Sequence, residues 1–275
     1  MIIEIDSLQF RVLVEESKLD SGKTPVVFLH GFTGSANDWE FIFDKLNPKY
    51  LPVAIDLIGH GKTSSPNALE SYSPLAMANQ LYIIFSKLKF NKSILCGYSM
   101  GGRAALNFAS LFPQKISGLV LESSTKGFFS EEEKSARIKN DFLLAEKLKN
   151  EGLENFITYW MNIPIFDSLM KINEEKLLAL KKSKLNNSII GLSNSLRGFS
   201  TGKMDIDLAE FNRLNIPVLL ITGELDKKFT DINKSLLNEF SNSRHKIITN
   251  AGHNTHVENE IEYISIVNNF LKYFL

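Results

Sequence analysis

The chain has 275 residues, of which 44% are hydrophobic, and its 31 basic and 31 acidic side chains give a formal net charge of +0. That length allows one large α/β domain with a substantial core, and the charge balance excludes an overall basic field that would attract nucleic acid. Cys96 is the single cysteine, so an intrachain disulfide framework is also excluded. We expect a small buried thiol at Cys96 and a reducing, cytoplasmic location.

The N-terminal segment, residues 1–6, carries acidic residues and no basic region, so it does not predict a signal peptide. No uninterrupted apolar run approaches the length of a membrane span. We therefore expect no membrane partner.

The first part of the chain predicts strands and one helix. Residues 1–20 alternate apolar and polar side chains, which indicates two antiparallel strands. Continuous apolar runs at residues 25–29 and 51–55 predict strands, and we expect the first to be central and buried on both faces. Between these runs, a glycine-containing loop at residues 30–35 leads into a helix predicted over residues 37–46.

Strand and helix signals then alternate up to residue 122. Residues 74–88 have helical periodicity and begin with a proline. Residues 94–96 predict a short buried strand, which is followed by a helical pattern that stops before Pro113. Residues 116–122 predict a further strand. This alternation is typical of a mostly parallel sheet flanked by helices.

A long helical stretch interrupts the alternation, because residues 127–207 have apolar side chains at helical spacings only. The strand pattern returns at residues 216–226 and 245–249. We therefore predict an α/β core formed by residues 1–126 and 208–275. The inserted residues 127–207 are expected to form a helical cap over the carboxyl edge of the sheet.

The most informative motif is a G-x-S-x-G sequence at residues 97–101, directly after the strand predicted at residues 94–96. A serine between a strand and a helix is the layout of a nucleophile elbow, in which Ser99 sits on a sharp turn. Gly97, Gly101 and Gly102 leave room for that turn. The alternative is an ordinary glycine-rich turn between a strand and a helix, because the motif by itself is common.

A serine hydroxyl becomes reactive when a histidine accepts its proton and a carboxylate orients that histidine. His253 lies in a polar loop after the last predicted strand, and His256, three residues on, is the weaker candidate. Asp226 follows the preceding strand, with Glu224 as the second choice. The order Ser99, Asp226, His253 is the order expected of α/β-hydrolases.

An oxyanion that develops during the reaction needs two backbone N–H donors aimed at it. We expect one from Met100, the residue after the proposed nucleophile. The second should come from the loop after the strand at residues 25–29, where Phe32 is our choice. We expect His30, in the same loop, to have a structural role.

These motifs together resemble the α/β-hydrolase fold over essentially the whole chain. Four segments carry this resemblance: residues 30–32 (H-G-F), 59–61 (G-H-G), 97–103 (G-Y-S-M-G-G-R) and 251–254 (A-G-H-N). The chain more narrowly resembles the 2-succinyl-6-hydroxy-2,4-cyclohexadiene-1-carboxylate synthase family, which are lyases of menaquinone biosynthesis. Arg103 and four further segments carry the narrower match: residues 137–141, 159–166, 195–202 and 223–229. Ile58 and Leu225 depart from that family, which usually has a proline and an aromatic residue there.

The substrate of that family carries several carboxylates, which arginine side chains bind through paired hydrogen bonds. The resemblance implies substrate-binding roles for five residues: Arg103, Arg137, Arg197, Tyr98 and Trp160. Lys181 or Lys182 is a further candidate. Without the resemblance, Arg137 would be interpreted as part of a solvated helix face and Trp160 as part of the cap core.

The resemblance implies a lyase that eliminates pyruvate from 2-succinyl-5-enolpyruvyl-6-hydroxy-3-cyclohexene-1-carboxylate. The product is 2-succinyl-6-hydroxy-2,4-cyclohexadiene-1-carboxylate, and no metal or organic cofactor is implied. The expected partner is a small polycarboxylate, with no nucleic acid and no membrane, and the expected state is a monomer or weak homo-oligomer. Two alternatives stay open: a carboxylesterase or C–C bond hydrolase that forms an acyl-enzyme, and a ligand receptor without chemistry.

Overall fold

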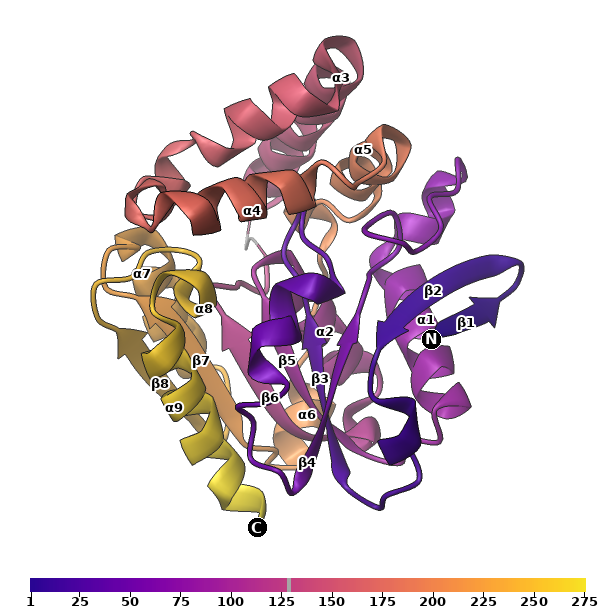
Figure 1. The fold of residues 1–275 in the computed structure, drawn as a ribbon, viewed down its shortest axis with the longest axis vertical. Coiled ribbons are helices and arrows are strands. Elements are labelled where there is room, and N and C mark those ends of the chain that lie inside the picture. Colours follow the sequence, from indigo (N-terminus) through magenta and orange to yellow (C-terminus); the bar gives the residue numbers. More distant parts are fainter. Residues whose placement is uncertain (128–129) are drawn as a thin grey trace.

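The computed structural model describes residues 1–127 and 130–275. Its strands form one sheet in the order β1-β2-β4-β3-β5-β6-β7-β8 (Figure 1). The strands are β1 (Ile2–Ile5), β2 (Leu8–Leu13), β3 (Thr24–Leu29), β4 (Tyr50–Ile55), β5 (Ser93–Tyr98), β6 (Ile116–Glu122), β7 (Val218–Gly223) and β8 (Ser243–Ile248). β1 pairs antiparallel with β2, and β2 with β4, whereas all pairs from β4 through β3 to β8 are parallel. The predicted α/β-hydrolase architecture is confirmed.

Helices connect the parallel strands, as right-handed crossovers require. The α-helices are α1 (Pro74–Lys87), α2 (Met100–Leu111), α3 (Glu131–Met161), α4 (Glu174–Lys184), α5 (Ile189–Gly198), α6 (Ala209–Arg213), α7 (Lys227–Leu237), α8 (Thr255–Glu258) and α9 (Glu260–Leu271). The 3₁₀ helices are η1 (Glu16–Lys18), η2 (Ala36–Ile42), η3 (Leu69–Tyr72), η4 (Pro113–Lys115), η5 (Pro164–Phe166), η6 (Leu169–Lys171), η7 (Thr201–Lys203) and η8 (Lys272–Phe274). Among the described residues, no helix is both long and apolar enough to cross a bilayer.

The helix predicted over residues 37–46 is wrong in type and length, because the chain forms the 3₁₀ helix η2 there. The buried side chains of η2 are Ala36, Trp39 and Ile42, which are spaced three residues apart. A 3₁₀ helix has three residues per turn, so this spacing puts all three side chains on one face. The Ala36 amide also donates to Asp56 Oδ1 at 2.5 Å, which ties the start of η2 to the turn after β4.

The strand predicted over residues 216–226 is limited to β7, and its end has a structural cause. Asp226 caps helix α7, since its carboxylate accepts a hydrogen bond from the Phe229 amide at 3.1 Å. A side chain that caps a helix leaves the extended ladder. The strand therefore stops short of Asp226.

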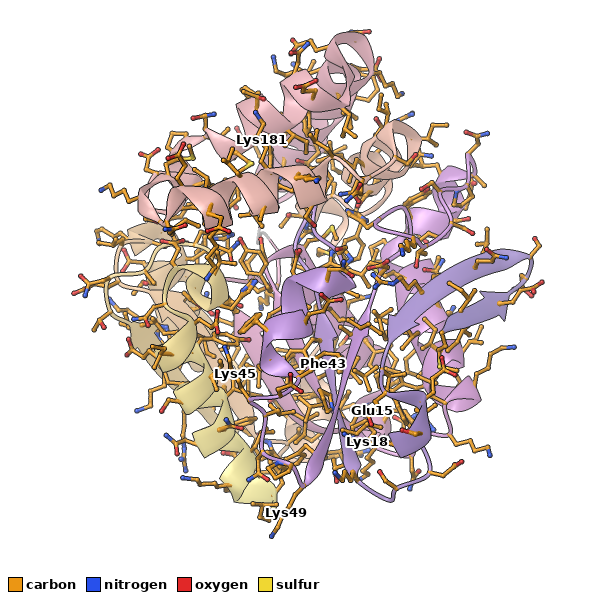
Figure 2. All side chains as sticks on the ribbon, viewed as in Figure 1. Glu15, Lys18, Phe43, Lys45, Lys49 and Lys181 are labelled. Carbon is orange, nitrogen blue, oxygen red and sulfur yellow. The ribbon has the colours of Figure 1, made fainter. Side chains whose placement is uncertain are left out.

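Apolar side chains cover both faces of the sheet, and Figure 2 shows them filling the space between the strands and the helices. One cluster joins the sheet to α1, α2 and α6, and includes Phe85, Phe108 and Phe211. The other joins it to η2 and α9, and includes Trp39 and Tyr263. With both faces buried, the parallel strands hold the loops at their carboxyl ends in place.

Between β6 and β7, the described residues contain helices and no strand. Helices α3, α4 and α5 lie together above the sheet in Figure 1 and share a small apolar cluster of their own. Helix α3 breaks at Gly152, where φ is 80° and ψ is 167°. The cap bounds at residues 127–207 stay a prediction, and residues 128–129 within them lie outside the described residues.

Candidate active site

Ser99 occupies the turn between β5 and α2 with φ at 50° and ψ at −106°, a conformation that is unusual for a residue with a side chain. The surrounding glycines explain how the turn closes. A Cβ at Gly97 would lie 2.3 Å from the Gly101 carbonyl oxygen, and a Cβ at Gly101 would lie 2.2 Å from the Leu29 carbonyl oxygen. Both positions therefore require glycine, and together they expose Ser99 at the carboxyl edge of the sheet.

His253 lies between Ser99 and Asp226. Its Nδ1 is 2.7 Å from Asp226 Oδ2, and its Nε2 is 3.1 Å from Ser99 Oγ. An ionised carboxylate only accepts hydrogen bonds, so Nδ1 carries the proton and Nε2 accepts from the serine hydroxyl. Asp226 and His253 are 7% and 2% exposed, which shields these bonds from water. The three predicted residues thus have the geometry of a Ser-His-Asp triad, and their catalytic roles stay a prediction.

The other candidates from the sequence have different partners. Glu224, the second-choice carboxylate, accepts from the Asn250 amide at 3.0 Å. His256 points its Nδ1 at the Glu122 carboxylate, with the shorter distance 2.8 Å. Both side chains flank the loop of His253 and do not contact Ser99.

Two backbone amides are available for an oxyanion. Phe32 and Met100 line the same cavity as Ser99. Met100 is the first residue of α2, where helical N–H groups have no partner within the helix and the helix dipole is positive. Among the hydrogen bonds of the described residues, neither the Phe32 amide nor the Met100 amide donates to a protein acceptor. Their role as an oxyanion hole stays a prediction.

The loop that carries Phe32 is fixed by contacts of His30 and Gly31 with neighbouring residues of the core. His30 Nε2 accepts from the Leu57 amide at 3.0 Å, and its Nδ1 lies 2.8 Å from the Gly31 carbonyl oxygen. A Cβ at Gly31 would lie 2.6 Å from Tyr98 Cε1, so only glycine fits against that ring. These contacts agree with a structural role for His30.

A cavity of about 640 Å³ opens above Ser99. Its floor includes Ser99, Met100 and His253 from the sheet edge, and its walls include Trp160 from α3 and Phe199 after α5. The ring of Trp160 lies 5.1 Å from that of Phe32 at an angle of 80°. The helical segment between β6 and β7 therefore contributes side chains to the cavity into which Ser99 is exposed.

Two arginines face this cavity. Arg103 Nη1 donates to the Phe199 carbonyl oxygen at 2.8 Å, and its guanidinium lies 5.1 Å from the Phe199 ring centroid. Arg137 Nε lies 2.8 and 2.9 Å from the two carboxylate oxygens of Asp141. No carboxylate among the described residues forms an ion pair with Arg103. Two guanidinium groups and one carboxylate leave this cluster with an excess of positive charge.

Burial, and after it the positive charge of Arg137, lower the pKa of Arg103 to about 9, while Asp141 acts in the opposite direction. The cause is the loss of solvation of a charged group without a carboxylate of its own. An anionic ligand beside Arg103 would offset that loss.

Two of the residues that the resemblance implied in substrate binding do not line the cavity. Tyr98 is 7% exposed and packs under the site, with its ring 5.5 Å from His253 and 5.0 Å from His256. The guanidinium of Arg197 lies 5.6 Å from the ring of Phe142, on the side of α5 that faces α3. Tyr98 therefore supports the site from below, and Arg197 packs within the helical segment.

The lysines of α4 also differ from expectation. Lys181, labelled in Figure 2, and Lys182 do not line the cavity. Lys184 is instead the buried lysine, and its Nζ donates to Thr33 Oγ1 at 3.2 Å. Burial lowers the pKa of Lys184. No sequence signal separates it from the neighbouring lysines, because α4 lacks a clear apolar face.

Asp141 is the second residue that sequence analysis missed. It is 1% exposed and lies four residues after Arg137 in α3. The i,i+4 spacing of opposite charges was a usable signal, since such side chains are neighbours on a helix.

Comparisons with known proteins identify the fold and the family. The model of the alpha/beta hydrolase fold family matches residues 24–260. A protein of Bacillus subtilis (strain 168), provisionally named 2-succinyl-6-hydroxy-2,4-cyclohexadiene-1-carboxylate synthase, is 42% identical over 246 residues, which cover 90% of this chain and 89% of that protein. A protein of Enterobacter sp. (strain 638) with the same synthase name is 32% identical over 234 residues, with 85% and 86% covered.

The structure of MenH from S. aureus superimposes with a TM-score of 0.88 at 31% identity, and the match covers 96% of this chain and 97% of that one. The segments that match include both the sheet and the helices between β6 and β7. The chain therefore belongs to the 2-succinyl-6-hydroxy-2,4-cyclohexadiene-1-carboxylate synthase family of the α/β-hydrolase fold.

Proposed function

We propose that this protein is a lyase that eliminates pyruvate from 2-succinyl-5-enolpyruvyl-6-hydroxy-3-cyclohexene-1-carboxylate. The product is 2-succinyl-6-hydroxy-2,4-cyclohexadiene-1-carboxylate, the compound in the names of its relatives. The observation that carries this proposal is the positive cluster of Arg103, Arg137 and Asp141 in the cavity above Ser99. It supplies binding groups for a polycarboxylate at a site built for proton transfer.

In the proposed reaction, His253 accepts the hydroxyl proton of Ser99 while Asp226 orients the imidazole. The serine oxygen then takes the acidic proton from the ring carbon next to the succinyl carbonyl. The electron pair of that C–H bond is held on the succinyl carbonyl oxygen as an enolate and then forms a new C=C bond in the ring. The existing ring double bond shifts by one position, and the bond between the ring and the enolpyruvyl oxygen breaks. The leaving enolate takes up a proton to become pyruvate, so no water is consumed and no acyl-enzyme forms.

Negative charge develops on the succinyl carbonyl oxygen when the C–H proton leaves. The amides of Phe32 and Met100 are the donors that we assign to this oxygen. They belong to different elements, the loop after β3 and the start of α2, so the rigid sheet sets their separation. This arrangement stabilises the charge without reorganisation during the reaction.

The same cluster disfavours the alternative of a carboxylesterase or C–C bond hydrolase. A neutral ester would leave the partly buried guanidinium of Arg103 without an anionic partner. A substrate carboxylate supplies that partner through a charge-assisted hydrogen bond. We assign Arg103 and Arg137 to the carboxylates of the substrate, and Trp160 to the wall of its pocket.

We further propose a small polycarboxylate, rather than nucleic acid, as the ligand. The formal net charge of the chain is +0, and the two arginines that we assign to binding, Arg103 and Arg137, line the cavity. A single chain supplies all the residues of the proposed site, which is consistent with a monomer or weak homo-oligomer. The cytoplasmic location stays a prediction from the sequence.

Turnover of two substrates by purified protein tests this function. One assay follows pyruvate release from the enolpyruvyl substrate, and the other follows hydrolysis of p-nitrophenyl acetate. We expect rapid pyruvate release and negligible ester hydrolysis. Efficient ester hydrolysis without pyruvate release would overturn the proposal and favour the hydrolase alternative.

A further inference from the structure

Glu122, the last residue of β6, is a buried carboxylate that contacts the segment after His253. It is 1% exposed, and its Oε1 accepts hydrogen bonds from Thr255 Oγ1 at 2.6 Å and from the His256 amide at 3.0 Å. His256 Nδ1 lies 2.8 Å from Oε2. One carboxylate therefore holds the start of α8, two and three residues after His253.

The backbone of Glu122 contacts the other half of the proposed catalytic pair. Its carbonyl oxygen accepts a hydrogen bond from the Ser99 amide at 2.8 Å. Glu122 is thus tied to Ser99 through its main chain and to the His253 loop through its side chain. Glu122 therefore connects the position of this loop to that of Ser99.

The imidazole of His256 is fixed by aromatic packing. Its ring stacks on Trp39 at a centroid distance of 4.3 Å, and the edge of Tyr98 lies against it at 5.0 Å. The same Tyr98 ring lies 5.5 Å from His253. His256 therefore cannot rotate away from Glu122 without displacing rings that also support the site.

A second carboxylate, that of Glu258 in α8, also holds the His253 loop. It accepts hydrogen bonds from the backbone amides of Gly252 at 2.7 Å and Asn254 at 3.1 Å. These two residues flank His253. The loop is consequently held by one carboxylate on its own helix and by a second, Glu122, on the sheet.

A buried carboxylate with its histidine partner is weak evidence for stability, since apolar residues of similar volume often stabilise a core equally well. A fully hydrogen-bonded polar network does specify one geometry. We infer that Glu122, acting through Thr255 and His256, is a positioning residue that sets the separation of Ser99 Oγ and His253 Nε2. The kinetic part of its test rests on the proposed function.

Thr255→Val removes one hydrogen bond to Glu122 at nearly constant side-chain volume. Thr249→Val is the matched control, because the Thr249 hydroxyl also donates to a carboxylate, that of Glu262 at 2.8 Å, near the exposed start of the same loop. We expect Thr255→Val to lower kcat for pyruvate release about tenfold with KM within about twofold, since misplaced catalytic groups slow the chemical step. Thr249→Val should match the wild type in both constants.

A second readout does not depend on activity. In protein labelled with 15N-histidine, the Nδ1 proton of His253 reports its bond to Asp226, and His253→Gln assigns the resonance. We expect this proton to exchange with water faster in Thr255→Val and in Glu122→Gln than in Thr249→Val. An unchanged resonance and unchanged kcat in both Glu122-network variants would overturn the inference, as would a rise in KM alone.

The two readouts separate this inference from the proposed function. If the wild type releases no pyruvate but the His253 resonance responds to Thr255→Val, the function fails and the positioning role stands. If pyruvate is released and neither variant alters kcat or the resonance, the function stands and the positioning role fails. A loss of thermal stability with an unchanged resonance would show a purely structural contact and would also overturn it.

Discussion

The carboxyl edge of the sheet and the helical segment above it hold their polar groups in different ways. At the sheet edge, Asp226, His253, Glu122 and His256 are all buried, and each has a short hydrogen bond to another member of the set. In the helical segment between β6 and β7, the Arg137 side chain is 34% exposed, and among the described residues its one ion pair is with Asp141 on the same helix. The first region fixes geometry, whereas the second presents charge.

Packing explains the difference. The strand ends are held between two large apolar clusters, one on each face of the sheet. Helices α3, α4 and α5 share a separate and smaller cluster. Catalysis needs groups placed to within a fraction of an ångström, and binding of an anion tolerates more freedom. We therefore expect substitutions at the sheet edge to act on kcat and substitutions around the positive cluster to act on KM.

Ser99→Ala gives the largest expected effect. Without the hydroxyl, no group is in place to take the substrate proton, so kcat should fall by about 10³-fold or more. Substrate binding should persist, because Arg103 and Arg137 are unchanged. Steady-state pyruvate release and calorimetric binding measure the two quantities. Ser110→Ala, on the helix α2 that follows Ser99 and outside the cavity, is the control, and more than a tenth of wild-type kcat in Ser99→Ala would contradict the assignment.

Arg103→Ala should show the opposite pattern. Loss of a partly dry guanidinium that binds a carboxylate should raise KM by about 10- to 100-fold, since such bonds contribute about 1.5–3 kcal/mol. Arg213→Ala removes an exposed arginine that is paired with Glu210, and it should leave KM unchanged. A fall in kcat at constant KM would instead place Arg103 among the groups that act on the transition state.

The contribution of histidines to the pH dependence of stability should arise outside the helical segment, because all five histidines lie outside residues 127–207. Burial lowers the pKa of His60 to about 3, and the neighbouring His30 contributes to that lowering. Between this value and the usual pKa of about 6.5, the unfolded chain binds the extra proton and the folded chain does not. The free energy of unfolding should therefore fall as pH decreases below 6.5, by about 1.4 kcal/mol per pH unit from His60.

Denaturant titrations of the wild type and His60→Gln at pH 7.5, 6.5 and 5.5 test this dependence. The variant should be less sensitive to pH by the contribution of His60. Equal slopes in the two proteins would mean that His60 does not titrate between the folded and unfolded states.

Arg197→Ala should have the smallest effect on function. Its guanidinium packs on Phe142 and does not line the cavity, so we expect KM to change less than about twofold. Arg137→Ala, on the neighbouring helix, should raise KM about tenfold. Comparing both variants in the pyruvate assay separates the arginine that faces the cavity from the one that packs within the helices. A large KM effect of Arg197→Ala would show that the cavity rearranges around substrate.

The sequence by itself determined the strand order along the chain, the elbow at Ser99 and the order of its two proposed partners. These features are local or follow from periodicity. The turn around Ser99 requires glycine at residues 97 and 101, which lie within a single short motif of the sequence. Parallel strands place the loops that follow them at one edge of the sheet. That is why Asp226 and His253 could be expected near Ser99 before any contact was known.

The tertiary structure decided which side chains face the cavity. Tyr98 adjoins Ser99 in sequence, yet its ring packs beneath the site, because successive side chains at the strand end point in opposite directions. Arg137 and Arg197 both lie on helices between β6 and β7. The way each helix is turned in the packed structure decides that Arg137 faces the cavity and Arg197 packs on Phe142. Glu122 is a strand residue without any motif. Its function depends on contacts with residues more than 130 positions away, which no local pattern encodes.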